Sequence, residues 1–299
     1  MSVKRAVAGL DGARALGYNF LNQHVRASAA IHPSGPSMTL ITLTTDFDLV
    51  DSYVAVMKGV ILTIAPDARI IDITHQIAPQ DVRAAAYVLS TAVAYFPPDT
   101  VHVVVVDPGV GSARRPIAVQ TGQTRLVGPD NGVFTSVLAA AEQPAVVHLD
   151  NPRFWRPAVS HTFHGRDIFA PVAAHLAAGV PLRDLGSLID DPVLLDSEPP
   201  VRLDNGVLRG QIIHVDRFGN LISNIPASWL AGSNWTIRIA GHDLHGVHTS
   251  YAGVDKGRLV ALVTSNDTLE IAVRDGSAAQ RLQVAAGEPV EARPRATGR

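Results

Sequence analysis

The chain has 299 residues, 46% of them hydrophobic and 17% charged, which is too apolar and too weakly charged for a disordered protein. The formal net charge of −2 gives no bulk positive field that would favour nucleic acid or an anionic membrane. The absence of cysteine excludes disulfides, thiolate metal sites and a cysteine nucleophile.

The first 37 residues do not read as part of a folded domain. They lack the compact apolar segment of a signal peptide and end in a loop-like stretch rich in proline and serine, 32–37. We therefore interpret residues 1–37 as a poorly ordered N-terminal extension. No apolar stretch of the chain reaches the roughly 18 residues of a membrane span, and we expect a soluble, cytoplasmic protein.

From Met38 onward, short β-branched stretches alternate with amphipathic stretches. Strands are predicted at 39–45, 69–73, 101–106, 116–120, 125–127 and 145–148. Helices are predicted at 51–65, 80–95, 132–142 and 165–178. The unbroken apolar run at 101–106 is typical of a strand buried on both faces. This alternation predicts an α/β domain with a mostly parallel sheet over residues 38–190.

The pattern changes after Pro181. Residues 186–200 are rich in proline and are predicted to be a linker. Only short β-like runs separated by turns follow it, at 207–215, 221–225, 235–239, 258–263 and 269–273. We predict a smaller antiparallel β-barrel domain over residues 200–290, and hence two domains.

Polar residues at the carboxyl ends of the predicted parallel strands are the first candidates for a site, because open α/β sheets bind ligands there. Asp46 follows the first strand, and its two carboxylate oxygens match the two hydroxyls of a sugar diol. Asp51 is placed to cap the following helix, a role that is compatible with ligand contact.

The strand at 101–106 leads into a glycine-rich loop that begins with Asp107 and contains Arg114. The loop fits neither the Walker pattern, because it has no lysine, nor the dinucleotide fingerprint. One interpretation is a simple glycine-rich turn. The other is that the loop holds a carboxylate and a guanidinium close enough to polarise each other.

Two histidine groups have spacings that metal ligands also show. They are His161 and His164 with Asp167, and His242, His245 and His248. Surface histidines are commoner than ligands, and we predict no metal at either group. A more specific hypothesis is that His164 is a neutral acid–base group with a carboxylate partner.

Asn220 lies in a polar turn of the predicted barrel, next to Gly219. It could be a turn residue that tolerates a left-handed backbone. Its amide could equally pair with an adenine edge through one donor and one acceptor. The residue pattern leaves both interpretations open.

Taken together, motifs from both predicted domains resemble the S-adenosyl-L-methionine hydroxide adenosyltransferase family, relatives of the fluorinating and chlorinating enzymes that attack the same carbon. The resemblance covers about Met38 to Ala286. In chain order the motifs are Thr44-Thr45-Asp46-Phe47, Met57-Lys58-Gly59-Val60-Ile61, Asp72-Ile73-Thr74-His75, Pro79-Gln80-Asp81-Val82-Arg83, Val106-Asp107-Pro108-Gly109-Val110-Gly111, Gly128-Pro129-Asp130-Asn131-Gly132, His164-Gly165-Arg166-Asp167, Phe218-Gly219-Asn220-Leu221-Ile222-Ser223-Asn224 and Leu269-Glu270-Ile271-Ala272-Val273.

The resemblance implies a homotrimer with the ligand at subunit interfaces, and a reaction of S-adenosyl-L-methionine with water that gives adenosine and L-methionine. It implies that the catalytic residues are Asp107, Arg114 and His164, that Asp46 holds the ribose, that Asp51, Asp216 and Ser265 hold the methionine end, and that Asn220 holds adenine. Because water attacks C5′ and a neutral thioether leaves, no metal or redox cofactor is required.

Two other functions compete with this one. A halide-using transferase would make 5′-halo-adenosine, but halogenating relatives lack an acid at the position of Asp107 and carry a long insertion that is absent here. A binding module would hold S-adenosyl-L-methionine or adenosine without turnover, which the intact set of candidate catalytic residues disfavours.

Overall fold

The computed structural model describes residues 39–231 and 234–295, which divide into two compact units. The division falls between Leu195 and Asp196, and each unit is described by itself. The extension predicted at 1–37 lies outside the described residues.

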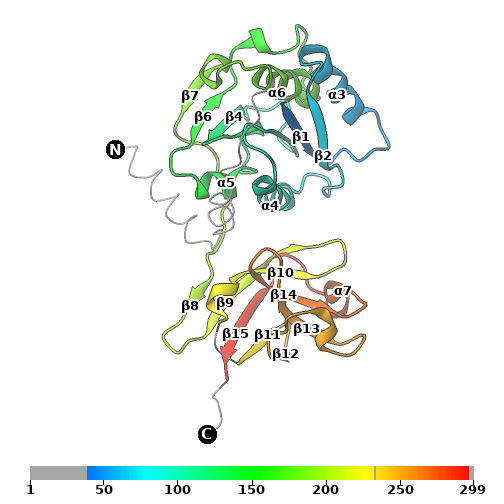
Figure 1. Cartoon of the computed structure of the whole chain (residues 1–299), viewed down its shortest axis with the longest axis vertical. Coiled ribbons are helices and arrows are strands. Elements are labelled where there is room, and N and C mark those ends of the chain that lie inside the picture. Colours follow the sequence, from blue (N-terminus) through cyan, green and yellow to red (C-terminus); the bar gives the residue numbers. More distant parts are fainter. Residues whose placement is uncertain (1–38, 232–233, 296–299) are drawn as a thin grey trace. The chain divides into compact units, whose positions relative to one another are not determined.

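The first unit is built on a seven-stranded sheet of order β2-β1-β3-β5-β4-β6-β7 (Figure 1). Its strands are β1 (Leu40–Thr45), β2 (Arg69–Thr74), β3 (Val101–Val105), β4 (Pro116–Thr121), β5 (Thr124–Pro129), β6 (Ala145–His148) and β7 (Ser187–Ile189). The first four strands of that order are parallel, and the remaining pairs are antiparallel because β4 and β5 form a hairpin. All five residues of β3 are buried, as the apolar run predicts.

Helices cover both faces of this sheet and enclose two cores. The helices are α3 (Tyr53–Ile64), α4 (Val82–Ala92), α5 (Thr135–Ala140) and α6 (Ala170–Ala177). Helices α3 and α6 pack with Ile41, Leu43 and Val103 in one core. Helices α4 and α5 pack with Val104 and Leu126 in the other. Neighbouring residues 103 and 104 thus point to opposite cores, as the pleat of a strand requires. The predicted α/β class is confirmed.

Three local predictions for this unit differ from the structure. The predicted linker contains β7, whose first residue, Ser187, is held by the carboxylate of Asp150 through its N–H (3.0 Å) and its hydroxyl (2.7 Å). The predicted cap of α3 is wrong, because the N-cap is Ser52 and its side chain makes no capping bond. The helix predicted at 165–178 begins as a π-helical turn, Gly165–Phe169.

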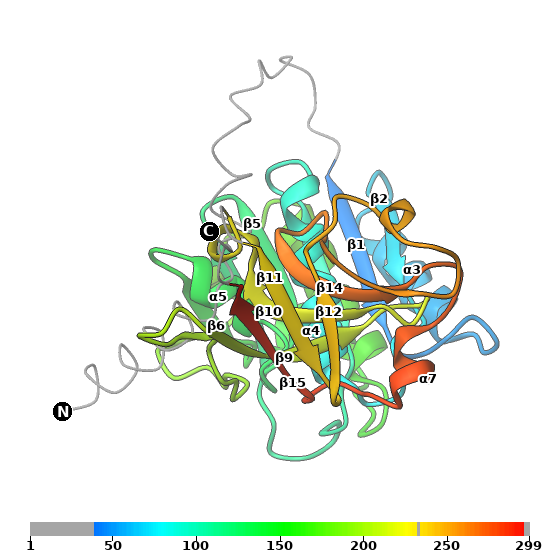
Figure 2. The same ribbon diagram turned by 90° about the horizontal axis from the view of Figure 1, so that it is seen from below.

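The second unit is an antiparallel sheet of order β12-β11-β15-β9-β10-β14-β13, with β8 paired to β9. The strands are β8 (Val201–Arg202), β9 (Leu208–Val215), β10 (Leu221–Pro226), β11 (Trp235–Ile239), β12 (His242–His245), β13 (Leu259–Val263), β14 (Thr268–Val273) and β15 (Pro289–Pro294). Figure 2 shows β11, β15 and β9 side by side. A bridge between His248 and Leu262 links the two ends of the order, so the sheet is nearly closed and has the predicted barrel shape.

The strands β8, β12 and β15 and the short helix α7 (Ala278–Leu282) of this unit were not predicted. Strand β12 contains His242 and His245 of the second histidine group, and it pairs with β11 from Thr236–His245 to Ile239–His242. No helix in either described range is long and apolar enough to cross a membrane.

Candidate active site

The candidate site of the first unit lies where two neighbouring parallel strands end. Strands β1 and β3 are paired up to Thr45 and Val105. Asp46 directly follows Thr45, and Asp107 follows Val105 after one further residue, Val106. Because parallel strands present their carboxyl ends at one edge of the sheet, both carboxylates belong to the same edge.

The loop of residues 107–115, here called the glycine loop, folds Arg114 back onto Asp107. Its turns are closed by hydrogen bonds from Val110 N to Asp107 O (3.2 Å) and from the Ser112 hydroxyl to Gly109 O (2.7 Å). Gly111 has φ +75°, and a Cβ there would lie 2.3 Å from the carbonyl oxygen of His161. Glycine is therefore required at 111, both by the backbone angle and by the close approach of the 160s segment.

Arg114 is the centre of the site. Its Nε donates to Asp107 Oδ1 at 3.1 Å and its Nη2 to Asp107 Oδ2 at 2.5 Å, a bidentate ion pair. Nη2 also donates to Nδ1 of His164 at 2.9 Å. The side chains of Asp107 and Arg114 are only 5% and 7% exposed. Arg114 Nη1 is buried and has no hydrogen-bond partner in the described part of the chain, so one donor remains for a bound molecule or water.

His164 reaches this pair because a glycine follows it. A Cβ at Gly165 would lie 3.1 Å from Met57 Sδ and 3.4 Å from Val105 Cγ1, so the backbone after His164 lies against α3 and the end of β3. A larger residue at 165 would require the side chains of Met57, Phe163 and Val105 or the π-helical turn to shift. The turn itself is a helix variant that is frequent at functional sites.

Burial dominates the electrostatics of the three groups. It raises the pKa of Asp107, although the adjacent Arg114 opposes that shift. It lowers the pKa of His164, and Arg114 lowers it further. The imidazole is therefore held neutral, with Nδ1 accepting from Arg114 and the proton on Nε2. The site thus combines a paired carboxylate, a guanidinium with one unused donor, and a neutral imidazole.

Asp46 is partly buried, and its Oδ2 accepts a hydrogen bond from the N–H of Gln80 at 2.8 Å. The end of β1 just before it is fixed by a chain of polar contacts that sequence reasoning missed. Thr45 Oγ1 lies 2.9 Å from Nδ1 of His75, whose Nε2 lies 3.0 Å from Asp72 Oδ1. Lys58 Nζ donates to Asp72 Oδ2 at 2.6 Å. These residues belong to quoted motifs, but no spacing along the chain indicates that they touch.

Asp51 is exposed just before α3. It belongs to the same β1–α3 connection as Asp46, in the first unit. The remaining predicted binding residues lie in the second unit. Ser265 is exposed in the turn between β13 and β14. The structure therefore divides the predicted methionine-binding residues between the two units.

Asp216 and Asn220 form a closed polar turn between β9 and β10, here called the 216–220 turn. Asp216 Oδ1 accepts from the N–H groups of Phe218 (2.9 Å) and Asn220 (2.8 Å), and Oδ2 accepts from Asn220 Nδ2 (2.9 Å). Gly219 has φ +80°, and a Cβ there would lie 2.0 Å from the Ser277 hydroxyl oxygen. The second N–H of the Asn220 amide and its Oδ1 have the donor and acceptor character that an adenine edge needs. Phe218, 77% exposed, is an apolar surface residue beside them that sequence reasoning did not single out.

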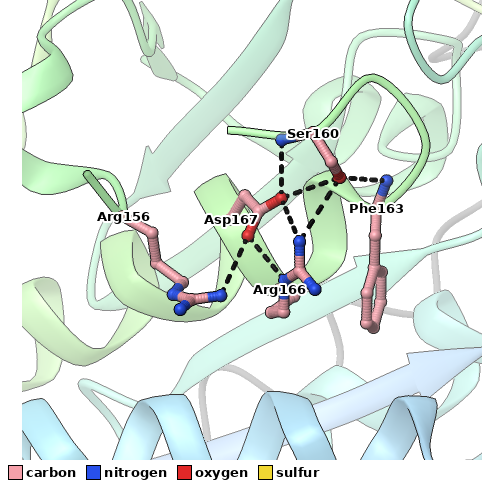
Figure 3. Close-up of polar contacts among 5 residues, drawn as sticks. All are labelled: Arg156, Ser160, Phe163, Arg166 and Asp167. Atoms are coloured by element: carbon pink, nitrogen blue, oxygen red, sulfur yellow. Dashed lines mark hydrogen bonds and ion pairs between the residues drawn. The ribbon is translucent and has the colours of Figure 1, made fainter. Parts of the chain in front are cut away.

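The histidine groups considered as metal ligands do not assemble. Among the described residues no group of three or more His, Asp or Glu side chains could hold a metal ion. Asp167, which had been grouped with His161 and His164, is fully buried and bonded to Arg166 and Ser160 instead (Figure 3).

Models of two protein domains match the chain. The model of the SAM hydroxide adenosyltransferase N-terminal domain matches residues 41–186, and that of the C-terminal domain matches residues 210–291. The chain is 42% identical over 250 residues to an (R)-S-adenosyl-L-methionine hydrolase of Salinispora tropica, covering 83% of this chain and 95% of the relative. A fluorinase of an Actinoplanes species is 30% identical over 212 residues, covering 62% of this chain and 71% of the relative.

A solved structure has the same fold. It is an uncharacterized conserved protein from Thermotoga maritima, with a TM-score of 0.78 and 39% sequence identity. The match covers 85% of this chain and 99% of that one, so both units are represented in it.

Proposed function

Because this chain belongs to the SAM hydroxide adenosyltransferase family, we propose that it is an enzyme that hydrolyses S-adenosyl-L-methionine to adenosine and L-methionine. Water attacks C5′ in line with the departing sulfur. The sulfonium leaves as a neutral thioether, so no group has to protonate it, and the proton given up by water is the only one to be moved. The chemistry requires neither a metal nor a redox cofactor.

The observation that carries this proposal is the buried cluster of Asp107, Arg114 and His164. The reaction needs a poorly hydrated, partly deprotonated water at near-attack distance. The ionised carboxylate of Asp107 accepts the proton of water, and the burial that raises the pKa of Asp107 makes it a stronger base. Nε2 of the neutral His164 donates a hydrogen bond that orients the water oxygen. Arg114 holds both groups through one guanidinium and stabilises negative charge as it develops.

The same roles explain why the site is buried. A hydroxide-like oxygen attacks a sulfonium cation, so charge disappears in the transition state. A dry site with fixed dipoles strengthens the attraction between the two reactants and does not have to reorganise during the reaction.

The binding residues complete the proposal. Asp46 holds the ribose hydroxyls, Asp51, Asp216 and Ser265 hold the methionine end, and Asn220 pairs with adenine. These residues come from both units. The proposal also includes a cytoplasmic location and a homotrimer with the ligand at subunit interfaces. Light scattering of the purified protein measures the number of subunits directly.

One incubation separates this function from its alternatives. The protein is incubated with S-adenosyl-L-methionine in ¹⁸O-labelled water, with and without chloride or fluoride. The products are separated by chromatography and identified by mass spectrometry. We expect equal amounts of adenosine and L-methionine, with the label in the adenosine 5′-hydroxyl. A 5′-halo-adenosine would indicate a halide transferase, and no turnover would indicate a binding module. Unlabelled adenosine would contradict direct attack at C5′.

A further inference from the structure

Asp167 is the most buried carboxylate outside the proposed reaction centre, with a side-chain exposure of 0%. Figure 3 shows how it is held. Its oxygens accept from Arg166 Nε (2.6 Å) and Nη2 (2.8 Å), from the Ser160 N–H (2.9 Å), and from the Ser160 hydroxyl (2.9 Å). Arg156 Nη1 lies 3.4 Å away. These donors lower its pKa to about 2.

A buried charge of this kind is a poor way to gain stability. Desolvating a carboxylate is costly, and well-packed apolar residues often serve a core equally well. What such a group can supply is a single defined conformation. Residues 155–163 have neither helix nor strand, so the backbone there needs side-chain partners to be fixed.

Asp167 fixes that segment at several points. The N–H of Arg156 donates to the backbone oxygen of Asp167 at 2.9 Å, which holds the start of the segment. Ser160 is held through both its N–H and its hydroxyl. The Ser160 hydroxyl oxygen also accepts from the N–H of Phe163 at 3.1 Å, which holds the residue directly before His164.

Phe163 is held from its other sides as well. The guanidinium of Arg166 lies 5.3 Å from its ring centroid, and the rings of Phe47 and Tyr53 lie 5.8 and 5.1 Å away. His164 is thus flanked by a pinned aromatic residue on one side and the glycine packed on β3 on the other. Its side chain is in turn held by the hydrogen bond from Arg114 Nη2 to Nδ1.

We propose that Asp167, acting through Ser160 and Arg166, is a positioning residue that holds His164 against Arg114. This inference rests on the proposed function, because His164 is one of its catalytic residues. Asp167 does not itself touch the reactants, since it is fully enclosed by protein. Its effect on the reaction passes through the backbone of residues 160–164.

The charge of Asp167 provides a second readout. The groups that act on His164 are Arg114 and His161, which lower its pKa, and Asp107 and Asp167, which raise it. Neutralising Asp167 removes one of the two charges that raise the pKa of His164. The pKa of His164 should therefore fall in Asp167→Asn, which reports the charge of Asp167. Because Ser160→Ala removes hydrogen bonds but no charge, a change of kcat and of the His164 signal in that variant reports the positioning alone.

The experiment compares four variants. Ser160→Ala removes the hydroxyl but no charge, and Ser160→Thr keeps a hydroxyl. Asp167→Asn removes the charge in the same shape. Ser187→Ala is the matched control, because Ser187 also donates its N–H and its hydroxyl to one aspartate, Asp150, but not near His164 in the sequence. Adenosine formation gives kcat and KM, and the imidazole Cε1–H signal, assigned by its loss in His164→Ala, gives the pKa of His164.

We expect kcat to fall about tenfold in Ser160→Ala and on the order of 10² in Asp167→Asn, with KM within about twofold, because small misplacements of a catalytic group cost this much. Ser160→Thr and Ser187→Ala should keep wild-type kcat. Wild-type kcat in Ser160→Ala, or an equal loss in Ser187→Ala, would overturn the inference. If Asp167→Asn does not fold, Ser160→Ala decides. If the wild-type protein forms no adenosine, the proposed function fails, while a shifted His164 signal in Ser160→Ala still supports the positioning role.

Discussion

The glycine loop and the 216–220 turn contain similar residues but are built differently. The first joins Asp107 and Arg114 to His164, which is 50 residues farther along the chain, and buries the ion pair. The second closes on itself within five residues, and within the described ranges its carboxylate accepts hydrogen bonds only from N–H groups of the same turn. A site assembled from distant segments can be dry and electrostatically strong, whereas a local turn fixes its own hydrogen-bonding groups, here with Asn220 buried and Phe218 exposed.

This difference suggests that the buried cluster and the turn have different functions. The buried cluster suits a chemical step, because low-dielectric surroundings strengthen its charges. The 216–220 turn suits recognition, because its donors and acceptors are pre-arranged by the hydrogen bonds to Asp216.

The largest effect should come from the buried cluster. Asp107→Ala and His164→Ala should each lower kcat by on the order of 10²–10⁴, the usual contribution of a positioned acid–base group. The double variant should be little worse than the poorer single one, because Arg114 links both residues into one unit. Steady-state rates of adenosine formation measure this, and thermal melts check that each variant folds.

Strict additivity of the two losses would mean that Asp107 and His164 serve separate steps. Wild-type turnover in His164→Ala would remove the histidine from the mechanism altogether. Asp107→Asn keeps the shape of the side chain and separates loss of charge from loss of packing.

Asp46→Ala should weaken binding far more than it alters the chemistry of bound substrate. A charged hydrogen bond to each ribose hydroxyl contributes about 1.5–3 kcal/mol, so the dissociation constant for adenosine should rise at least about tenfold. Calorimetric titration with adenosine measures it. Asp48→Ala is the control, because Asp48 is an exposed carboxylate of the same loop. An unchanged dissociation constant would place Asp46 outside the binding site.

Acid should destabilise the first unit through His102. This side chain is buried in β3 beside the hydroxyl of Thr42, and burial lowers its pKa from 6.5 to about 4. The folded state thus favours neutral imidazole, so its contribution to stability is complete above pH 6.5 and is lost as the pH falls toward 4. Between pH 8 and pH 5 the free energy of unfolding should drop by about 2 kcal/mol from this group.

Urea unfolding of the wild type and of His102→Asn at both pH values measures that contribution. The variant should lose less stability on acidification than the wild type. In the second unit the buried carboxyl of Glu270 behaves oppositely, because burial raises its pKa and its protonated form is favoured in the folded state. An equal loss in the wild type and the variant would contradict the assignment to His102.

The smallest effect should come from the 216–220 turn. Asn220→Ala should raise KM for S-adenosyl-L-methionine by about fivefold or more and leave kcat unchanged, because two neutral hydrogen bonds of at least about 0.5 kcal/mol each are lost. Asn205→Ala is the matched control in the same unit, since Asn205 also bonds a turn N–H, that of Val207, at 3.1 Å. A fall in kcat with constant KM would show that the turn takes part in the chemical step.

Much of the fold could be predicted because its signals are local. The buried run of β3, the helical spacing of α3 and α4, and the turn residues between barrel strands depend on neighbours only a few positions away. The motifs that carry the family resemblance are also contiguous. The sequence by itself therefore determined the fold class, the family and the list of candidate residues.

The tertiary structure decided which of those residues meet. Strand β15 was missed because its assignment depends on pairing with β9 and β11, which precede it by more than 50 residues, and not on its own pattern. Asp167 looked like a metal ligand beside two histidines, yet its carboxylate is enclosed by Ser160 and Arg166. Partners of a buried polar group are chosen by packing and desolvation, which act across space, so no spacing along the chain could have shown that Arg114 bonds to His164.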